Sequence, residues 1–216
     1  MGGEVVIICA GSLEDPSRLV EETRKVPAPV VLCADGGARH AADLGIVPQA
    51  VIGDMDSVKE ELLVSLEEKG SAIIRYPVAK DQTDTELALS YALGLSPSRI
   101  VIFAALGTRV DHSLANIFLM ARAVPEGIDL RILDHRCEIM AVTGETSIMG
   151  EPGTTVSILP FSPAVSGVTL EGFEYPLRDA TMEMGTTRGI SNRLVKPEGK
   201  IRVEKGRLLV IVDHSV

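Results

Sequence analysis

The chain has 216 residues, of which 45% are hydrophobic and 24% are charged, a composition typical of a folded globular protein. Its formal net charge of −9, without a basic stripe, argues against a protein that binds nucleic acid by neutralising phosphates. The longest apolar runs fall short of the roughly 20 residues that cross a bilayer, so we expect neither nucleic-acid nor membrane partners.

The first predicted strand lies in the N-terminal segment MGGEVVIICAG. An acidic residue precedes its apolar run and no basic residue does, which indicates a buried strand and not a signal peptide. The cysteines Cys9, Cys33 and Cys137 lie far apart, in or beside apolar runs. We expect buried free thiols, and therefore a reducing, cytoplasmic location.

Up to residue 136, short apolar runs alternate with helical patterns. This alternation predicts a mainly parallel sheet with flanking helices on both faces, a Rossmann-like α/β domain over residues 1–136. The predicted strands are residues 4–10, 29–34, 50–53, 71–76, 99–106 and 129–133. Capping patterns predict helix starts at Asp15-Pro16, at Ser57 with Glu60, and at Thr83 with Glu86.

After residue 136 the helical patterns end, and glycines separate short strand-like runs. Such spacing is typical of a β-sandwich or a barrel. We therefore predict an all-β sandwich domain over residues 137–216. Its predicted strands are residues 137–142, 154–159, 165–170, 180–184, 201–204 and 207–213.

Polar residues follow four of the predicted strands in the first domain. Ligands bind beyond the carboxyl ends of the strands in an open parallel sheet, so these residues are expected to line one edge. Each group alone also fits a turn or a helix cap, and it is their joint position that favours a ligand site. The residues are Asp35 with Gly36 and Gly37, Asp54 with Asp56, Asp81 with Asp84, and Arg109 with Asp111 and His112.

Asp54 and Asp56 are two residues apart, and in extended backbone such side chains point the same way. Two adjacent carboxylates repel unless a cation lies between them, and oxygen ligands of this kind suit Mg²⁺ or Mn²⁺. Asp84, at the start of its helix, is a third candidate ligand. P-loop, dinucleotide-binding, nucleophile-elbow and zinc-binding motifs are absent from the sequence. The residues predict metal-assisted chemistry on a phosphorylated substrate, by either transfer or hydrolysis.

Five motifs, in order along nearly the whole chain, resemble those of the thiamine pyrophosphokinase family. They are ADGG at residues 34–37, GDMDS at 53–57, KDQTDTE at 80–86, GTRVDHSLAN at 107–116 and GISN at 189–192. The resemblance implies an α/β catalytic domain, a C-terminal β-sandwich and a homodimer that binds thiamine at the subunit interface. It also implies transfer of the β,γ-pyrophosphoryl group of ATP to the hydroxyl of thiamine, with release of AMP.

The resemblance further implies roles for individual residues. Asp54, Asp56 and Asp84 would hold Mg²⁺, with Asp81 beside them as a fourth catalytic residue. The residues implied on the ATP side are Asp35, Gly36, Gly37, Thr83, Arg109, Asp111, His112 and Asn116. Ser191 and Asn192 would contact thiamine from the β domain. The general base for the acceptor hydroxyl stays open between Asp81 and Asp84.

The chain departs from the family pattern at several points. Thr108 and Ala104 stand where family members carry glycine, and the chain has no tryptophan to stack on thiamine. Candidates for covering the thiamine ring are Phe173, Tyr175 and Met184. The alternative functions are pyrophosphoryl transfer to another acceptor such as a hydroxymethylpterin, non-catalytic nucleotide sensing, and metal-dependent phosphate hydrolysis.

Overall fold

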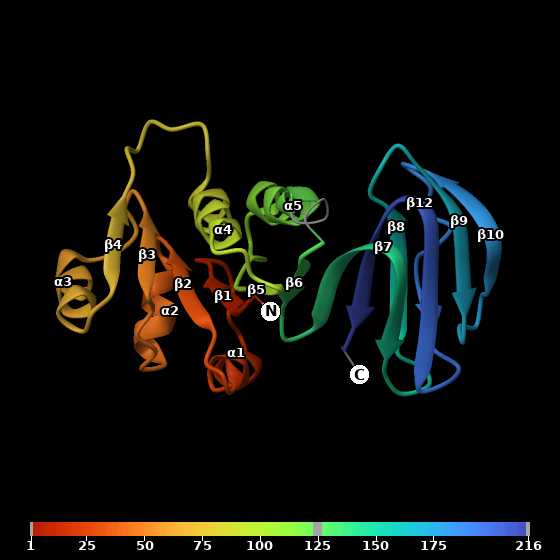
Figure 1. Cartoon of the computed structure of the whole chain (residues 1–216), viewed down its shortest axis with the longest axis horizontal. Helices are drawn as coiled ribbons and strands as arrows, with labels where there is room; N and C mark the ends of the chain where they lie inside the picture. Colours follow the sequence, from red (N-terminus) through yellow and green to blue (C-terminus); the bar gives the residue numbers. More distant parts are fainter. Residues whose placement is uncertain (1, 123–126, 215–216) are drawn as a thin grey trace. The chain divides into compact units, whose positions relative to one another are not determined.

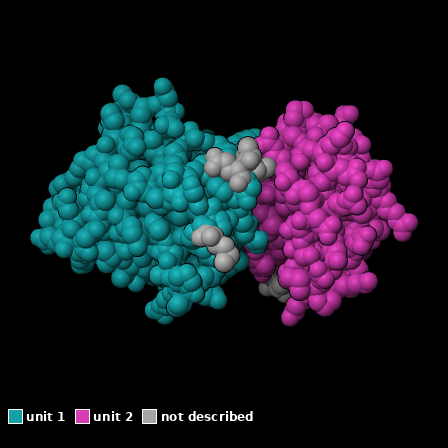
Figure 2. All heavy atoms as spheres, viewed as in Figure 1, with its two compact units in different colours: residues 1–135 teal, residues 136–216 magenta. Residues whose placement is uncertain are grey.

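The computed structural model describes residues 2–122 and 127–214. The chain divides into two compact units, residues 1–135 and 136–216, which Figure 2 colours separately. The predicted boundary after residue 136 lies one residue from this division. Among the described residues, no helix is long and apolar enough to cross a membrane.

The first unit contains a parallel sheet with the strand order β6-β5-β1-β2-β3-β4 (Figure 1). Its strands are β1 (Glu4–Ile8), β2 (Val30–Ala34), β3 (Ala50–Gly53), β4 (Ala72–Arg75), β5 (Arg99–Phe103) and β6 (Asp129–Leu133). The chain proceeds outward from β1 to β4 and then returns to place β5 on the other side of β1. The strand order therefore reverses between β1 and β5, which is where open α/β sheets bind ligands. The predicted parallel sheet is confirmed.

Helices cover both faces of this sheet, as predicted. They are α1 (Ser17–Thr23), α2 (Gly37–Asp43), α3 (Glu60–Glu68), α4 (Asp84–Gly94) and α5 (Val110–Leu119), followed by the 3₁₀ helix η1 (Met120–Arg122). On one face, Val6 and Ile8 of β1 share a buried cluster with Leu19 of α1 and Leu63 of α3. α4 packs on β1, β2 and β3 from the opposite face, on the same side as α5 (Figure 1).

One of the three predicted helix starts is capped as expected. Thr83 Oγ1 accepts a hydrogen bond from the Glu86 amide at 3.2 Å before α4. Asp15 Oδ1 accepts one from the Ser17 amide at 2.9 Å, but Pro16 is in the N-cap position and α1 begins one residue later than predicted. The capping box at Ser57 is wrong, because α3 begins at Glu60 without a side-chain cap. Ser57 Oγ donates to Asp56 Oδ1 instead.

The second unit is all β, as predicted. Its strands are β7 (Cys137–Met149), β8 (Thr155–Pro160), β9 (Ala164–Glu171), β10 (Leu177–Glu183), β11 (Asn192–Arg193) and β12 (Glu198–Asp213). β12 pairs with β7 along both of its halves, with β9 through its first half and with β8 through its second. Gly206, with a φ of +90°, lies at the irregularity between the halves, so the two strands predicted there are one. Buried residues of both halves, including Val203 and Leu208, belong to one hydrophobic cluster, as in a sandwich.

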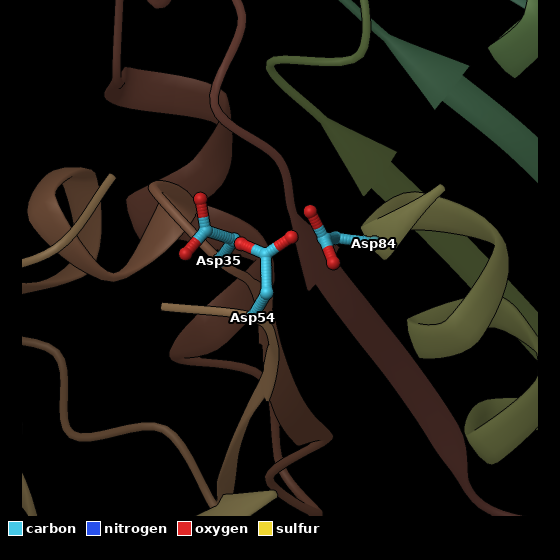
Figure 3. A group of neighbouring side chains, drawn as sticks. All are labelled: Asp35, Asp54 and Asp84. Carbon is cyan, nitrogen blue, oxygen red and sulfur yellow. The ribbon is translucent and has the colours of Figure 1, made fainter. Parts of the chain in front are cut away.

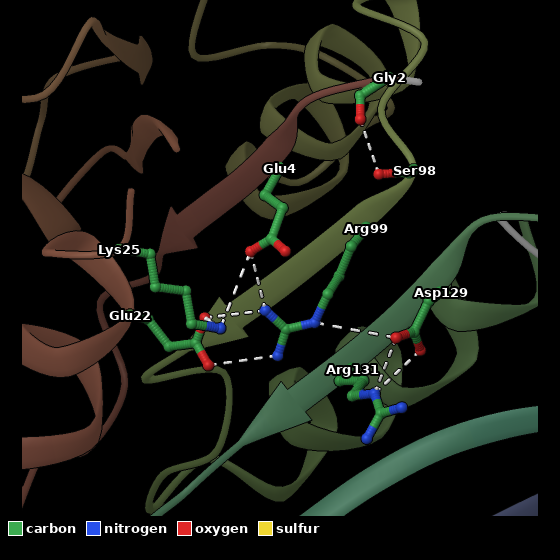
Figure 4. Close-up of polar contacts among 8 residues, drawn as sticks. All are labelled: Gly2, Glu4, Glu22, Lys25, Ser98, Arg99, Asp129 and Arg131. Carbon is green, nitrogen blue, oxygen red and sulfur yellow. Dashed lines mark hydrogen bonds and ion pairs between the residues drawn. The ribbon is translucent and has the colours of Figure 1, made fainter. Parts of the chain in front are cut away.

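A charge network fixes the edge of the first unit's sheet at which its strands begin (Figure 4). Arg99, at the start of β5, donates from Nη1 to Glu22 Oε2 of α1 at 2.8 Å and to Glu4 Oε2 of β1 at 3.1 Å. Its Nε lies 3.8 Å from Asp129 Oδ2 at the start of β6. One guanidinium therefore links the first residues of three strands to a helix. The network lies at the opposite end of the strands from the edge where ligands are expected.

Replacing Arg99 by methionine is expected to lower the free energy of unfolding by about 2 kcal/mol, because the largely buried Glu22 loses its hydrogen bonds from the guanidinium and is left with Lys25 Nζ, 2.6 Å away, as its partner. Arg75→Met is the matched control, since the Arg75–Glu60 pair is solvent-exposed and such pairs contribute about 0–1 kcal/mol. Urea denaturation of both variants measures the difference. Equal stability of the two variants would contradict a structural role for the Arg99 network.

Candidate active site

A cavity of about 580 Å³ lies at the carboxyl ends of β1, β2, β3 and β5. Its walls include Cys9, Ala10 and Gly11 after β1 and residues 104–109 after β5, so it spans the point where the strand order reverses. The volume is within the range of about 300–1,000 Å³ that is typical of small-molecule sites. The edge of the sheet that was predicted to bind a ligand therefore contains a cavity.

Three carboxylates converge in this cavity (Figure 3). Asp35 follows β2, Asp54 follows β3 and Asp84 begins α4, and one oxygen of each lies within 4.8 Å of the others. Gly53 makes their approach possible, because a Cβ there would lie 2.9 Å from both Asp35 Cβ and Asp84 Oδ1. Three strand-to-helix junctions thus supply one acidic cluster.

Lys80 is a member of this site to which the sequence motifs assigned no role. Its Nζ lies 2.6 Å from Asp54 Oδ2 and 3.1 Å from Asp84 Oδ1. The hydrogen bond from Lys80 lowers the pKa of Asp54, whereas burial raises the pKa of Asp84 despite the same neighbour. Burial acts against the charge of Lys80, but its two carboxylate partners outweigh that effect and raise its pKa. No sequence pattern indicated that this lysine would point inward from its loop.

The cluster fits a divalent cation. Among the described residues, Asp35 Oδ1 and Asp84 Oδ1 are buried and accept no aligned hydrogen bond, although Lys80 Nζ is close to the latter. Buried carboxylate oxygens without donors are costly, and one ammonium does not balance three carboxylates. Hard oxygen ligands of this type suit Mg²⁺. The donor set is therefore consistent with the predicted metal.

Asp56 lies apart from the cluster of three. Met55 has a φ of +65°, so the backbone from Asp54 to Asp56 is not extended, and the prediction of an extended backbone there is wrong. Asp56 is exposed, lines the cavity, and accepts a hydrogen bond from Ser57 Oγ at 2.8 Å. Its role as a metal ligand stays a prediction, while Asp35, predicted for the ATP side, occupies the place beside Asp54.

The other residues predicted for ATP and catalysis fall into two groups. Those that line the cavity with Asp35 are Thr83, Arg109, His112 and Asn116, and those that do not are Gly36, Gly37, Asp81 and Asp111. Asp111 is exposed and binds the Arg109 guanidinium, with Oδ2 2.6 Å from Nη2. Gly37 packs α2 against β1, since a Cβ there would lie 2.0 Å from Ile8 O.

The connection from β5 to α5 is held by side chains of α5. Asn116 Nδ2 donates to Ala105 O at 2.7 Å, and Ser113 Oγ accepts from the Gly107 amide at 3.1 Å. Ala104 has a φ of +52°, in the left-handed region that glycine adopts most easily. Alanine in place of glycine at position 104 therefore introduces a strained residue in the cavity wall. Thr108, the other residue that replaces a family glycine, also lines the cavity.

Comparison with known proteins covers both units. A model of the thiamin pyrophosphokinase catalytic domain matches residues 25–132, and a model of the vitamin B1 binding domain of the same enzyme matches residues 145–208. A thiamine pyrophosphokinase from Bacillus subtilis is 38% identical over 179 residues, which are 82% of this chain and 84% of that relative. This chain belongs to the thiamine pyrophosphokinase family.

Solved structures of the family agree with this fold. The crystal structure of the thiamine pyrophosphokinase from Bacillus subtilis matches with a TM-score of 0.87 at 31% identity, over 99% of this chain and 100% of that one. The structure from Geobacillus thermodenitrificans matches with a TM-score of 0.84 at 26% identity, over 98% of each chain. Both thiamine pyrophosphokinases therefore share the complete two-unit architecture.

The residues predicted to contact thiamine lie in the unit that the vitamin B1 binding domain matches. Ser191 is exposed at a φ of +57°, whereas Asn192 is buried. Asn192 Oδ1 accepts from the amides of Tyr175 and Arg193, and its Nδ2 donates to Tyr175 O at 2.8 Å. Among the side chains considered for covering the ring, Phe173 is a core residue, whereas Tyr175 and Met184 are exposed.

Asn192→Ala is expected to lower the free energy of unfolding by about 2 kcal/mol, because three backbone hydrogen bonds are lost in a buried place. Ser191→Ala, its exposed neighbour, is the control and should leave stability within about 0.5 kcal/mol of the wild type. Thermal unfolding of both variants with and without thiamine separates folding from binding. A stable Asn192→Ala variant with weakened thiamine affinity would show that Asn192 is a ligand and not a structural residue.

Proposed function

We propose that this enzyme transfers the pyrophosphoryl group of ATP to the hydroxyl of thiamine, giving thiamine diphosphate and AMP. The observation that carries the proposal is the convergence of Asp35, Asp54 and Asp84 in the cavity at the switch point of the sheet. It occurs in a chain whose two halves match the catalytic and the vitamin B1 binding models of one family.

The acidic cluster supports a role in holding Mg²⁺ with the phosphates of ATP. A bound Mg²⁺ would neutralise phosphate oxygens and orient the group that is transferred, which is most of what such reactions require. Asp54 and Asp84 would hold it, with Asp35 beside them and Asp56 at the cavity wall. Arg109, at the same wall with an exposed guanidinium, would bind phosphate oxygens.

The acceptor hydroxyl must lose its proton as the new bond to phosphorus forms. Of the two candidate bases, Asp84 lines the cavity and Asp81 does not. His112, which also lines the cavity, is a further proton acceptor within the site. The chain's own residues thus bind the nucleotide, hold the cation and provide acceptors for one proton.

Calorimetric titration tests the acceptor. Thiamine is expected to bind in the presence of Mg²⁺ and α,β-methylene-ATP, an analogue in which the bond to be broken is blocked, and a hydroxymethylpterin is not. Binding of the pterin without thiamine binding would overturn the thiamine assignment while leaving the class of reaction intact. Phosphate release from ATP without any acceptor would favour the hydrolase.

We further propose a homodimer in a reducing cytoplasm. The outer face of α5 exposes Val110, Leu114 and Phe118 at helical spacing, with 70%, 50% and 61% of their surfaces accessible. Apolar side chains in such a row support a protein contact. The cysteines are free thiols, which fits a reducing compartment. Sedimentation analysis should give twice the chain mass of 23.0 kDa, and a monomer would contradict the dimer.

A further inference from the structure

Lys80 lies on the two carboxylates that are proposed to hold the cation. Its ammonium is 2.6 Å from Asp54 Oδ2 and 3.1 Å from Asp84 Oδ1, and the side chain is only 14% exposed. A divalent cation bound by these carboxylates would be repelled by the ammonium, because like charges at such separation repel strongly. Lys80 and a divalent cation therefore compete for the same two carboxylates.

The loop that carries Lys80 is exposed to solvent along most of its length. Residues 76–79 and 81–83 are exposed, and Figure 1 shows the connection from β4 to α4 as a long excursion from the sheet. The ends of the loop are fixed by a hydrogen bond from the Tyr76 amide to Gly53 O at 2.8 Å and by the Thr83 cap. Between these ends, the ion pairs of Lys80 connect the loop to the acidic cluster.

We propose that Lys80 is an exchangeable counter-ion. Its ammonium neutralises Asp54 and Asp84 before the divalent cation binds, and then leaves them to form an ion pair with the polyphosphate of the nucleotide. This inference rests on the proposed function. The flexible four-carbon stem of lysine lets the ammonium move without a change in the fold. The phosphates of a nucleotide in the same cavity are the anions to which the displaced charge can turn. Lys80 is thus a positioning residue for the nucleotide.

If Lys80 exchanges partners in this way, removal of its charge should raise the affinity for the cation and lower the affinity for the nucleotide. Without nucleotide, Lys80→Gln should bind Mn²⁺ about tenfold more tightly than the wild type, because a competing cation is gone. With Mn²⁺ present, the same variant should bind α,β-methylene-ATP about tenfold more weakly, because a phosphate partner is gone. A lysine that served only to hold the loop would weaken both affinities or neither.

Titration of Mn²⁺, followed by calorimetry and by the loss of the free-ion electron paramagnetic resonance signal, provides the test. Lys69→Gln is the matched control, since Lys69 is exposed after α3 and the substitution removes the same charge. Lys80→Arg keeps the charge and should bind Mn²⁺ as the wild type does. Circular dichroism spectra confirm that each variant is folded.

Different results would overturn the counter-ion inference and the proposed metal site. If the wild type binds Mn²⁺ and Lys80→Gln binds it equally or less tightly in the absence of nucleotide, the counter-ion inference is overturned and the proposed function stands. If no variant binds Mn²⁺, with or without nucleotide, the proposed metal site is overturned and the inference with it. Tighter Mn²⁺ binding together with weaker nucleotide binding supports the exchange.

Discussion

Replacing Asp54 by asparagine is expected to reduce kcat by about a thousandfold, equivalent to ~4 kcal/mol of transition-state stabilisation. Asp54 contributes to the three-carboxylate cluster and is also the 2.6 Å partner of Lys80. The amide keeps the shape of the side chain but removes the charge that a cation requires. Initial rates at saturating ATP, thiamine and Mg²⁺ measure the loss.

Folding should be much less affected than turnover. The substitution removes the ion pair with Lys80 but also relieves repulsion from Asp35 and Asp84, so the free energy of unfolding should change by less than about 1 kcal/mol. Asp43→Asn is the matched control, because Asp43 is exposed at the end of α2 and does not line the cavity. We expect it to leave kcat near the wild-type value. Near-normal turnover of Asp54→Asn, or an equal loss in both variants, would contradict the assignment.

Gly37→Ala is expected to destabilise the first unit by about 3 kcal/mol and to lower its melting temperature by roughly 6–12 °C. The new Cβ would lie 2.0 Å from Ile8 O and 2.7 Å from Ile8 C, atoms of a strand in the middle of the sheet. A backbone carbonyl in a paired strand cannot rotate away as a side chain can, so α2 must separate from β1.

Gly94→Ala provides the comparison for this prediction. A Cβ at Gly94, the last residue of α4, would meet nothing within 4 Å. The melting temperature of the Gly94→Ala variant should therefore equal that of the wild type or be slightly higher. Differential scanning calorimetry distinguishes the two variants. If Gly37→Ala has the melting temperature of the wild type but a lower affinity for ATP, Gly37 is a nucleotide contact, as the family motif implied, and not a packing residue.

The α/β half of the fold was predictable because its strands are short and separated by clear helix signals. Residues 50–53 and 129–133 form strands with the predicted bounds. Prediction was weaker in the β unit, where Lys205-Gly206 has the composition of a turn. In the structure Gly206 lies within β12 at an irregularity of pairing, and the strand continues past it. Composition does not distinguish a bulge from a turn, because glycine at positive φ occurs in both.

The edge of the sheet at which the site lies was predictable, but its inner arrangement was not. In an open parallel sheet, ligands bind beyond the carboxyl ends of the strands, and this alone predicts that Asp35, Asp54 and Asp84 lie at one site. The pairing of Asp54 with Asp56 assumed an extended backbone, which the positive φ of Met55 contradicts. The inward position of Lys80 depends on the path of an exposed loop, which has no periodicity to predict it.

Product analysis is the decisive test of pyrophosphoryl transfer from ATP to thiamine. The purified protein is incubated with ATP, Mg²⁺ and thiamine, and the nucleotides and thiamine species are separated by chromatography. We expect AMP and thiamine diphosphate to form in equal amounts, and both to disappear when thiamine or Mg²⁺ is omitted. ADP with thiamine monophosphate, phosphate released without thiamine, or ATP bound without any product would contradict it.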